Sequence, residues 1–140
     1  MEIPSIGDKK RAKILRKWHR TIKLDELTDS AKKAEKGLLW LLAQSPIIHV
    51  GAHTIEAADS LVKMAILSGF KNSGMKSAGK KNIVEVRSTE RLDAPIGKDG
   101  KLFCNDEYLQ LLVDISNSVM EKSNGKLRRF KKKLRNIPVP

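Results

Sequence analysis

A charged corner directly follows an apolar stretch in "NIVEVRSTE", residues 82–90. The apolar residues of this stretch are typical of a buried strand, and Arg87, Ser88 and Thr89 come immediately after them. A guanidinium group binds carboxylates and phosphates with paired hydrogen bonds, and each hydroxyl can donate or accept. Because ligands of α/β sheets bind at strand ends, this corner is predicted to border a small-ligand site. A structural interpretation also remains open, in which Arg87 pairs with a carboxylate such as Asp93.

Two other places carry residues suited to chemistry. Asn72, Ser73 and Gly74 lie in "GFKNSGM", between a predicted helix end and a predicted strand start. Small polar residues and glycine let a ligand approach the main chain, which suits a phosphate or a small cofactor. His49 ends an apolar segment and is a candidate for a functional residue, although a histidine there can also be a packing residue.

Several common functional signatures are absent from the sequence. There is no G-x-G-x-x-G after a strand, no Walker loop and no G-x-S-x-G nucleophile elbow. The single cysteine, Cys104, and the three histidines give no zinc-binding spacing, and Gly51 separates His49 from His53. No metal site is therefore predicted.

The positive charge is concentrated in two blocks. The formal net charge is +12; residues 9–23 hold eight basic residues and no acid, and residues 121–135 hold eight and one acid. This distribution favours a polyanionic partner, and two blocks that met in space would form one patch. The alternatives are that the basic runs are only solvated faces and that Trp18 is a core residue. The predicted RNA-binding residues, with aromatic stacking by Trp18 and His19, are Lys9, Lys10, Arg16, Lys17, Trp18, His19, Arg128, Arg129 and Lys131.

The first half of the chain is predicted to hold two helices and two strands. Apolar spacing predicts a helix over 24–36 that stops at Gly37. The runs "LLWLLAQ" (38–44) and "IIHV" (47–50) are interpreted as buried strands near the sheet centre. Thr54 then caps a second helix, which Gly69 ends.

The second half is predicted to hold a hairpin, a tight turn and a last helix. The hairpin turns around Gly79, and Asp-Gly at 99–100 signals another turn. Asn105 caps the last helix, which Asn124 and Gly125 are expected to loosen. Its expected apolar face comprises Tyr108, Leu112, Ile115 and Val119. The segment "KRAKILRKWHR", residues 10–20, fits a helix or a strand equally well.

Together these elements predict one α/β (α+β) domain over residues 1–140, with a mixed β-sheet and packed helices. Residues 125–140 form its basic C-terminal helix end and tail. No stretch approaches the roughly 18 apolar residues of a membrane span, and the first residues lack the apolar core of a signal peptide. A soluble, cytoplasmic protein without membrane contact is expected.

The motifs "GFKNSG", "EVRST" and "DEYLQLLVDISN", in this order, closely resemble the tRNA wybutosine-synthesising protein 3 family of archaea and eukaryotes. The resemblance extends over nearly the whole chain. It implies a fold that is not the Rossmann methyltransferase fold, and it favours a strand for "AKILRKWHR".

The resemblance also implies an activity. It is that of an S-adenosylmethionine-dependent methyltransferase, which methylates N4 of the tricyclic wyosine precursor at the guanosine 3′ of the anticodon of tRNA-Phe. In this interpretation His49, Arg87, Ser88 and Thr89 border the reaction site, and Asn72, Ser73 and Gly74 bind the cofactor. The basic blocks hold the anticodon stem-loop, and no obligatory protein partner is evident.

One departure from the family keeps an alternative open. Members usually carry a serine-rich signature ending in Ser-Gly-Arg upstream of "GDKK", whereas this chain starts at "MEIPS". The chain is therefore interpreted either as N-terminally truncated or as a shortened relative of the family. The alternative function is a noncatalytic RNA-binding domain that retains the fold.

Overall fold

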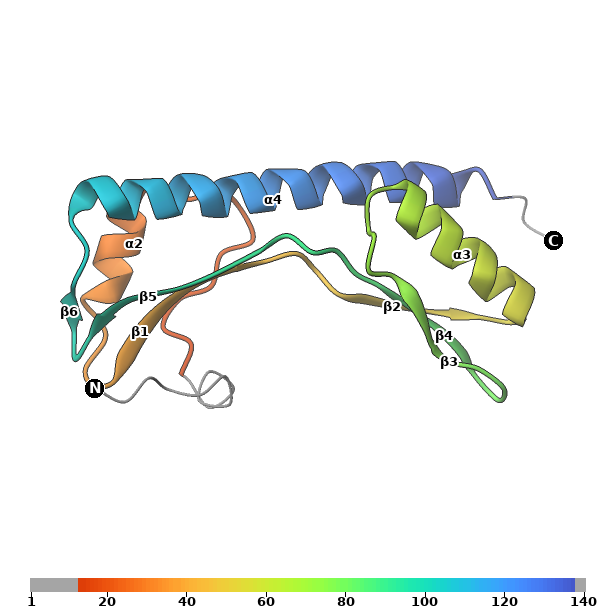
Figure 1. The fold of residues 1–140 in the computed structure, drawn as a ribbon, viewed down its shortest axis with the longest axis horizontal. Helices are drawn as coiled ribbons and strands as arrows, with labels where there is room; N and C mark the ends of the chain where they lie inside the picture. Colours follow the sequence, from red (N-terminus) through yellow and green to blue (C-terminus); the bar gives the residue numbers. More distant parts are fainter. Residues whose placement is uncertain (1–12, 138–140) are drawn as a thin grey trace.

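The structure is a computed structural model of the chain, and it describes residues 13–137. Helices and strands alternate irregularly along the chain (Figure 1). In chain order they are α2 (Leu24–Ala31), β1 (Leu38–Gln44), β2 (Ile48–Ala52), α3 (Ile55–Leu67), β3 (Gly74–Ser77), β4 (Asn82–Val86), β5 (Arg91–Lys98), β6 (Lys101–Leu102) and α4 (Asp106–Arg135).

The strands form two three-stranded sheets, in the orders β1-β5-β6 and β2-β4-β3. The helices lie on one side of both sheets, and α4 runs along their whole length (Figure 1). The predicted α+β domain with packed helices is confirmed. The pairing differs from the expected mixed sheet, because every strand pair within residues 13–137 is antiparallel. Short connections such as the turns before β4 and β6 join antiparallel neighbours, whereas parallel pairs need long crossovers.

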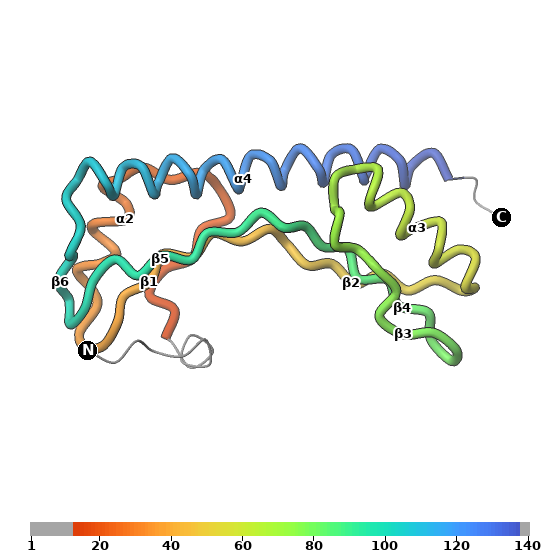
Figure 2. The backbone as a smooth tube through the Cα atoms, in the orientation of Figure 1, coloured from red at the N-terminus to blue at the C-terminus, as the bar shows by residue number. Residues whose placement is uncertain are grey.

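The two sheets are continuous parts of one bent ribbon. β1 leads into β2 through residues 45–47, and β4 leads into β5 through residues 87–90. At this join, the Ser45 amide donates a hydrogen bond to the Glu90 carbonyl (3.4 Å). Figure 2 shows the resulting arch beneath α4. The charged corner identified in the sequence therefore lies where the ribbon passes from one sheet to the other.

Each sheet packs its own hydrophobic cluster against a different half of α4. The cluster at the first half of α4 includes residues of the helix itself; its buried members are Ile22, Leu27, Leu41, Ala94, Ile96, Leu109, Leu112 and Val113. Beneath the second half they are Ala58, Leu61, Ala65, Phe70, Val84, Val86 and Phe130. Phe70 and Phe130 meet edge to face, with ring centroids 6.0 Å apart. The long helix thus joins the two clusters into one domain.

The predicted helix caps are confirmed. The Thr54 hydroxyl accepts from the Ala57 amide (3.0 Å) and the Asn105 side chain accepts from the Tyr108 amide (2.9 Å). These bonds satisfy amides that have no partner within the helix. Gly69 follows the α3 cap residue with φ of +110°, a conformation that glycine adopts without strain.

Four details of the helices and strands were predicted wrongly. α2 ends at Ala31 and not near residue 36, because its last carbonyls are already bonded by the turn at 32–34. α4 continues unbroken through Gly125, since Phe130 anchors its second half in the core. β1 and β2 are edge strands and not central ones. On α4, Tyr108 and Ile115 of the predicted apolar face are exposed; the buried positions are Leu109, Leu112, Val113, Ser116, Val119, Ser123 and Phe130.

Residues 13–23 form neither the strand nor the helix that the sequence allowed. This segment is fixed by tertiary contacts instead: Asn117 of α4 accepts from the Ile22 amide (2.9 Å) and donates to the Ile22 carbonyl (2.8 Å). The buried Ile22 side chain adds to the first hydrophobic cluster. No helix within residues 13–137 is long and apolar enough to cross a membrane.

Candidate functional site

The two faces of the β2-β4-β3 sheet have opposite characters. Along β4, Val84 and Val86 are completely buried in the cluster beneath α3 and α4. Ile83 and Glu85 alternate with them, so their side chains lie on the opposite face. Both helices lie on the first side of this sheet (Figure 1). The Glu85 face is therefore open, within the part of the chain that the structure describes.

Three basic side chains surround Glu85 on this open face. His49 lies directly opposite on β2, and its Nε2 is 2.9 Å from Glu85 Oε2. Lys76 Nζ is 3.7 Å from the same oxygen and 3.5 Å from His49 Nε2, and Arg87 Nη1 is 3.6 Å from Oε1. His49, Lys76 and Arg87 keep 45%, 55% and 46% of their side-chain surface exposed. We call these four residues the Glu85 cluster.

The electrostatics of the cluster keep its central carboxylate ionised. The hydrogen bond from His49 has the largest effect and lowers the pKa of Glu85; burial opposes it, and the positive charges nearby, that of Lys76 foremost, lower this pKa further. Because ionised Glu85 only accepts, His49 donates its Nε2 proton to it. In a neutral His49 ring, Nδ1 is then the nitrogen with a free lone pair.

The predicted cofactor-binding residues lie beside Arg87. The Asn72 amide donates to the Arg87 carbonyl (3.1 Å), and the Arg87 amide donates to the Ser73 hydroxyl (3.0 Å). Gly74 is in register with Glu85, and a β-carbon at Gly74 would meet no atom within 4 Å. The structure thus brings Asn72, Ser73, Gly74, His49 and Arg87 together from separate segments of the sequence.

Ser88 forms its side-chain hydrogen bond away from the Glu85 cluster, with Glu90. Its hydroxyl donates to Glu90 Oε2 (2.5 Å), and the other Glu90 oxygen forms an ion pair with Lys126 of α4. The Lys126 bond and then the Ser88 bond lower the pKa of Glu90 to about 2. Thr89, between them, is exposed.

Arg87 does pair with a carboxylate, as the structural interpretation allowed, but its partner is Glu85, and the suggested partner Asp93 is bound by another arginine. Arg91 makes that pair, with its Nη2 2.9 Å from Asp93 Oδ2. The alternation of the extended chain points Arg87 to the same face as Glu85, whereas Asp93 belongs to the next strand. Arg87 therefore remains available to the open face.

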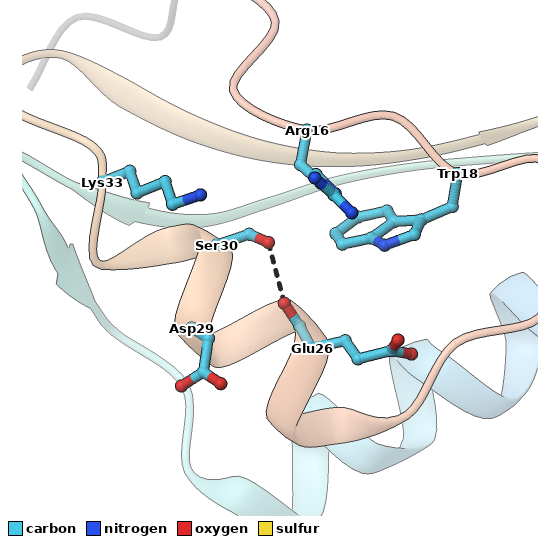
Figure 3. A pocket seen from close by; sticks show the side chains of 6 residues that line it. All are labelled: Arg16, Trp18, Glu26, Asp29, Ser30 and Lys33. Carbon is cyan, nitrogen blue, oxygen red and sulfur yellow. Dashed lines mark hydrogen bonds between the residues drawn. The ribbon is translucent and has the colours of Figure 1, made fainter.

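The first basic block lies against α2 and the first cluster. Trp18 is half-buried and packs on that cluster, as the core interpretation allowed, while Arg16, Lys17 and His19 are exposed. Figure 3 shows the Arg16 guanidinium beside the Trp18 indole. A hollow of about 270 Å³ lies there, lined by Arg16, Trp18, Glu26, Asp29, Ser30 and Lys33. Lys9 and Lys10 lie outside the described residues.

The second basic block lies on the last turns of α4. Arg128 and Lys131 are exposed, whereas Arg129 donates from Nε to the Ser68 carbonyl (3.1 Å) and so closes the end of α3. The first block is tied to α4 at Asn117, about 17 Å along the helix axis from Arg128. The described parts of the two blocks therefore lie over different halves of α4 and do not merge.

Sequence reasoning missed Glu85 and Lys76. The alternation in "NIVEVR", with Val84 and Val86 on one side and Glu85 and Arg87 on the other, carried the signal for Glu85. Lys76 depends on the register of β3 with β4, which only the structure supplies. No group of three or more potential metal ligands occurs among residues 13–137.

Comparison with known proteins identifies relatives of the chain. A family model described as Methyltransferase TYW3 matches residues 2–136. A Pyrococcus abyssi protein named tRNA(Phe) 7-((3-amino-3-carboxypropyl)-4-demethylwyosine(37)-N(4))-methyltransferase 1 is 45% identical over 138 residues, which cover 98% of this chain and 71% of that protein. A Pyrococcus horikoshii protein of the same name is 48% identical, over 96% of this chain and 69% of its own.

Solved structures show the same fold. The structure of the PH1069 protein from Pyrococcus horikoshii superposes with a TM-score of 0.87 at 48% identity, over 96% of this chain and 68% of that one. A hypothetical protein from Aeropyrum pernix, at 24% identity, has a TM-score of 0.70 over 82% of this chain and 70% of its own. The expectation of a fold other than the Rossmann type is confirmed.

Proposed function

Because the chain belongs to the methyltransferase TYW3 family, we propose that it methylates N4 of a demethylwyosine base at position 37 of tRNA(Phe), the reaction for which its Pyrococcus relatives are named. The observation that supports this assignment is the Glu85 cluster, together with Asn72, Ser73 and Gly74, on one open sheet face. Residues from three strands and two connections converge there, as a group that binds and orients two substrates would require.

The proposed methyl donor is S-adenosylmethionine, which when bound supplies an electrophilic methyl group on a sulfonium sulfur. The residues present suit such a ligand. Gly74 leaves open space beside the sheet, and Asn72 is exposed next to it. Asn72, Ser73 and Gly74 would hold the donor close to the main chain, where no side chain blocks its approach.

His49 is proposed to act on a proton of the acceptor base. A ring nitrogen that carries hydrogen must release a proton as it gains a methyl group. With Nε2 fixed by its hydrogen bond to Glu85, His49 presents Nδ1 as the acceptor for that proton. Arg87 and Thr89 would position the base, and Ser88 would hold the corner through its bond to Glu90.

The basic residues are proposed to bind the anticodon stem-loop through its phosphates. Arg128 and Lys131 are exposed on α4, and Arg16, Lys17 and His19 are exposed near Trp18. We retain Lys9, Lys10 and Arg129 in this surface, although Arg129 also closes α3. Such binding should weaken steeply with salt, because counterions are released on contact. An enzyme with this substrate would act in the cytoplasm.

The direct test is transfer of labelled methyl from S-adenosylmethionine to tRNA(Phe) that carries the unmethylated precursor. Unmodified tRNA(Phe) is the matched control. Incorporation only into the precursor-bearing tRNA would establish the activity. No incorporation, together with salt-sensitive tRNA binding, would instead support the noncatalytic RNA-binding domain.

A further inference from the structure

The Glu85 cluster combines one carboxylate with two permanent cations at distances longer than hydrogen bonds. Arg87 Nη1 and Lys76 Nζ stand 3.6 and 3.7 Å from the Glu85 oxygens. Ionised groups in direct contact approach to about 2.8 Å. Both cations therefore keep donors that a ligand can use, and Glu85 Oε1 has no closer partner than Arg87 among the described residues.

We propose that Glu85, Lys76 and Arg87 form a subsite for the zwitterionic end of an α-amino acid. The ligand carboxylate binds between Arg87 and Lys76, and the ligand ammonium donates to Glu85 Oε1. An α-amino acid carries both groups on one carbon, so its receptor must offer an acceptor and cationic donors side by side. This proposal rests on the proposed function and names what its site recognises.

The charge of the cluster favours a zwitterion over a phosphate. The two permanent cations Lys76 and Arg87 exceed the single carboxylate of Glu85 by one positive charge. A phosphate group at the same place would lie against the ionised carboxylate, whose pKa is lowered by the cluster itself. An ammonium group turns this repulsion into a charge-assisted hydrogen bond.

The surroundings leave room for such a ligand. Gly74 lies opposite Glu85 in the sheet, and a β-carbon there would meet nothing within 4 Å. The Arg87 amide donates a hydrogen bond to the Ser73 hydroxyl, which fixes the main chain from which the Arg87 side chain extends. Glu85 is held from the other side by His49. The subsite is therefore positioned before any ligand arrives.

Two molecules of the proposed reaction carry this chemistry. The base named for the Pyrococcus relatives has a 3-amino-3-carboxypropyl chain, and S-adenosylmethionine has a methionine end. Both present an ammonium and a carboxylate on one carbon. Binding experiments can distinguish the two sources without requiring turnover.

The donor experiment measures calorimetric binding of S-adenosylhomocysteine and of 5′-methylthioadenosine, which lacks the amino-acid end. Wild-type protein is compared with Glu85→Gln and Lys76→Met. The matched controls are Glu35→Gln and Lys63→Met, which change the same charges at exposed positions elsewhere. If the subsite binds the donor, both cluster variants lose at least tenfold in affinity for the homocysteine ligand and keep their affinity for methylthioadenosine.

The tRNA experiment uses the same variants with two substrates. One tRNA(Phe) carries the demethylwyosine base with the 3-amino-3-carboxypropyl chain, and the other carries the tricyclic base without that chain. If the subsite binds the base, the cluster variants lose at least tenfold in affinity for the first tRNA and bind the second as wild type does.

A selective loss in either experiment supports the proposal and identifies the source of the amino-acid group. Unchanged affinities in both, for variants whose circular dichroism matches wild type, would overturn it. Selective binding without any methyl transfer by the wild-type protein would contradict the proposed function and leave the subsite established. The two proposals can therefore fail separately.

Discussion

Glu85 and Glu90 lie on either side of the same corner and face opposite environments. Glu90 is held by Ser88 and by Lys126, whose side chain is only 13% exposed. Glu85 is surrounded by three basic side chains that are about half exposed, and two of them, Lys76 and Arg87, stand beyond hydrogen-bond distance. The first carboxylate joins the ribbon to α4, whereas the second remains open to a ligand.

The difference shows that the sequence of a charged corner does not reveal how each charge is used. Exposed ion pairs contribute little to stability, while a pair shielded from water leaves an uncompensated charge when one partner is removed. We therefore expect substitutions at the Glu90 pair to act on folding and substitutions at the Glu85 cluster to act on binding and catalysis. The following predictions test that division, from the largest expected effect to the smallest.

Arg87→Ala should lower the rate of methyl transfer by on the order of 100-fold or more, because it removes a positioned donor from the proposed site. Its melting temperature should stay close to that of wild type, since the side chain is 46% exposed and its pair with Glu85 is 3.6 Å long. Arg91→Ala is the control, because Arg91 pairs with Asp93 on the other sheet. A large loss of stability in Arg87→Ala would contradict this role.

Glu90→Gln should lower the free energy of unfolding by about 2 kcal/mol, because it leaves the Lys126 ammonium without its anionic partner. Urea unfolding measures this loss. Replacing both residues, as in Glu90→Gln with Lys126→Met, should cost less than the two single substitutions together. Additive losses would mean that the pair does not act as a unit.

The stability of the wild-type protein should fall as the pH drops from about 5 to about 2. The pKa of Glu90 is lowered from 4.5 to about 2 in the folded state, so between these values the unfolded chain binds more protons. The contribution of Glu90 is complete above pH 5 and disappears as the pH falls through its folded pKa. Glu90→Gln should show a shallower decline, with the remainder due to groups such as Glu26, whose pKa is also about 2.

Gly69→Ala should cost about 1 kcal/mol more than Gly79→Ala in thermal unfolding. Both glycines have nearly the same φ, +110° and +111°, so alanine meets the same backbone strain at each. At Gly69 a β-carbon would also come within 2.9 to 3.1 Å of the Lys126 side chain, whereas at Gly79 it would meet nothing within 4 Å. Equal costs would show that Lys126 moves away freely and is not fixed by Glu90.

Local signals in the sequence predicted much of the fold. Thr54 and Asn105 marked helix starts, and the Asp-Gly pair at 99–100 marked a turn, because each depends on neighbouring residues alone. The end of α2, the continuity of α4 past Gly125 and the irregular path of residues 13–23 depend on tertiary packing. These features could not be derived from local pattern.

The candidate site was predicted in part. His49, Arg87 and Ser73 were selected for their chemistry, and the structure brings them close together. Lys76 was not predicted, because the register of β3 with β4 decides its position. The bond of Ser88 to Glu90 was not predicted either, because it depends on the position of Lys126 on α4. Residue type therefore indicated which side chains could react, and the sheet determined which of them meet.

The most direct test of the division between the two carboxylates is a paired measurement on Glu85→Gln and Glu90→Gln. Each substitution removes one charge and keeps the size of the side chain. Melting temperature and methyl transfer to precursor-bearing tRNA(Phe) are measured for both at a temperature where both are folded. We predict that Glu90→Gln melts lower and keeps its rate within a few-fold, while Glu85→Gln melts as wild type and loses at least tenfold in rate. An equal loss of stability in both variants, with activity following only the folded fraction, would contradict the account.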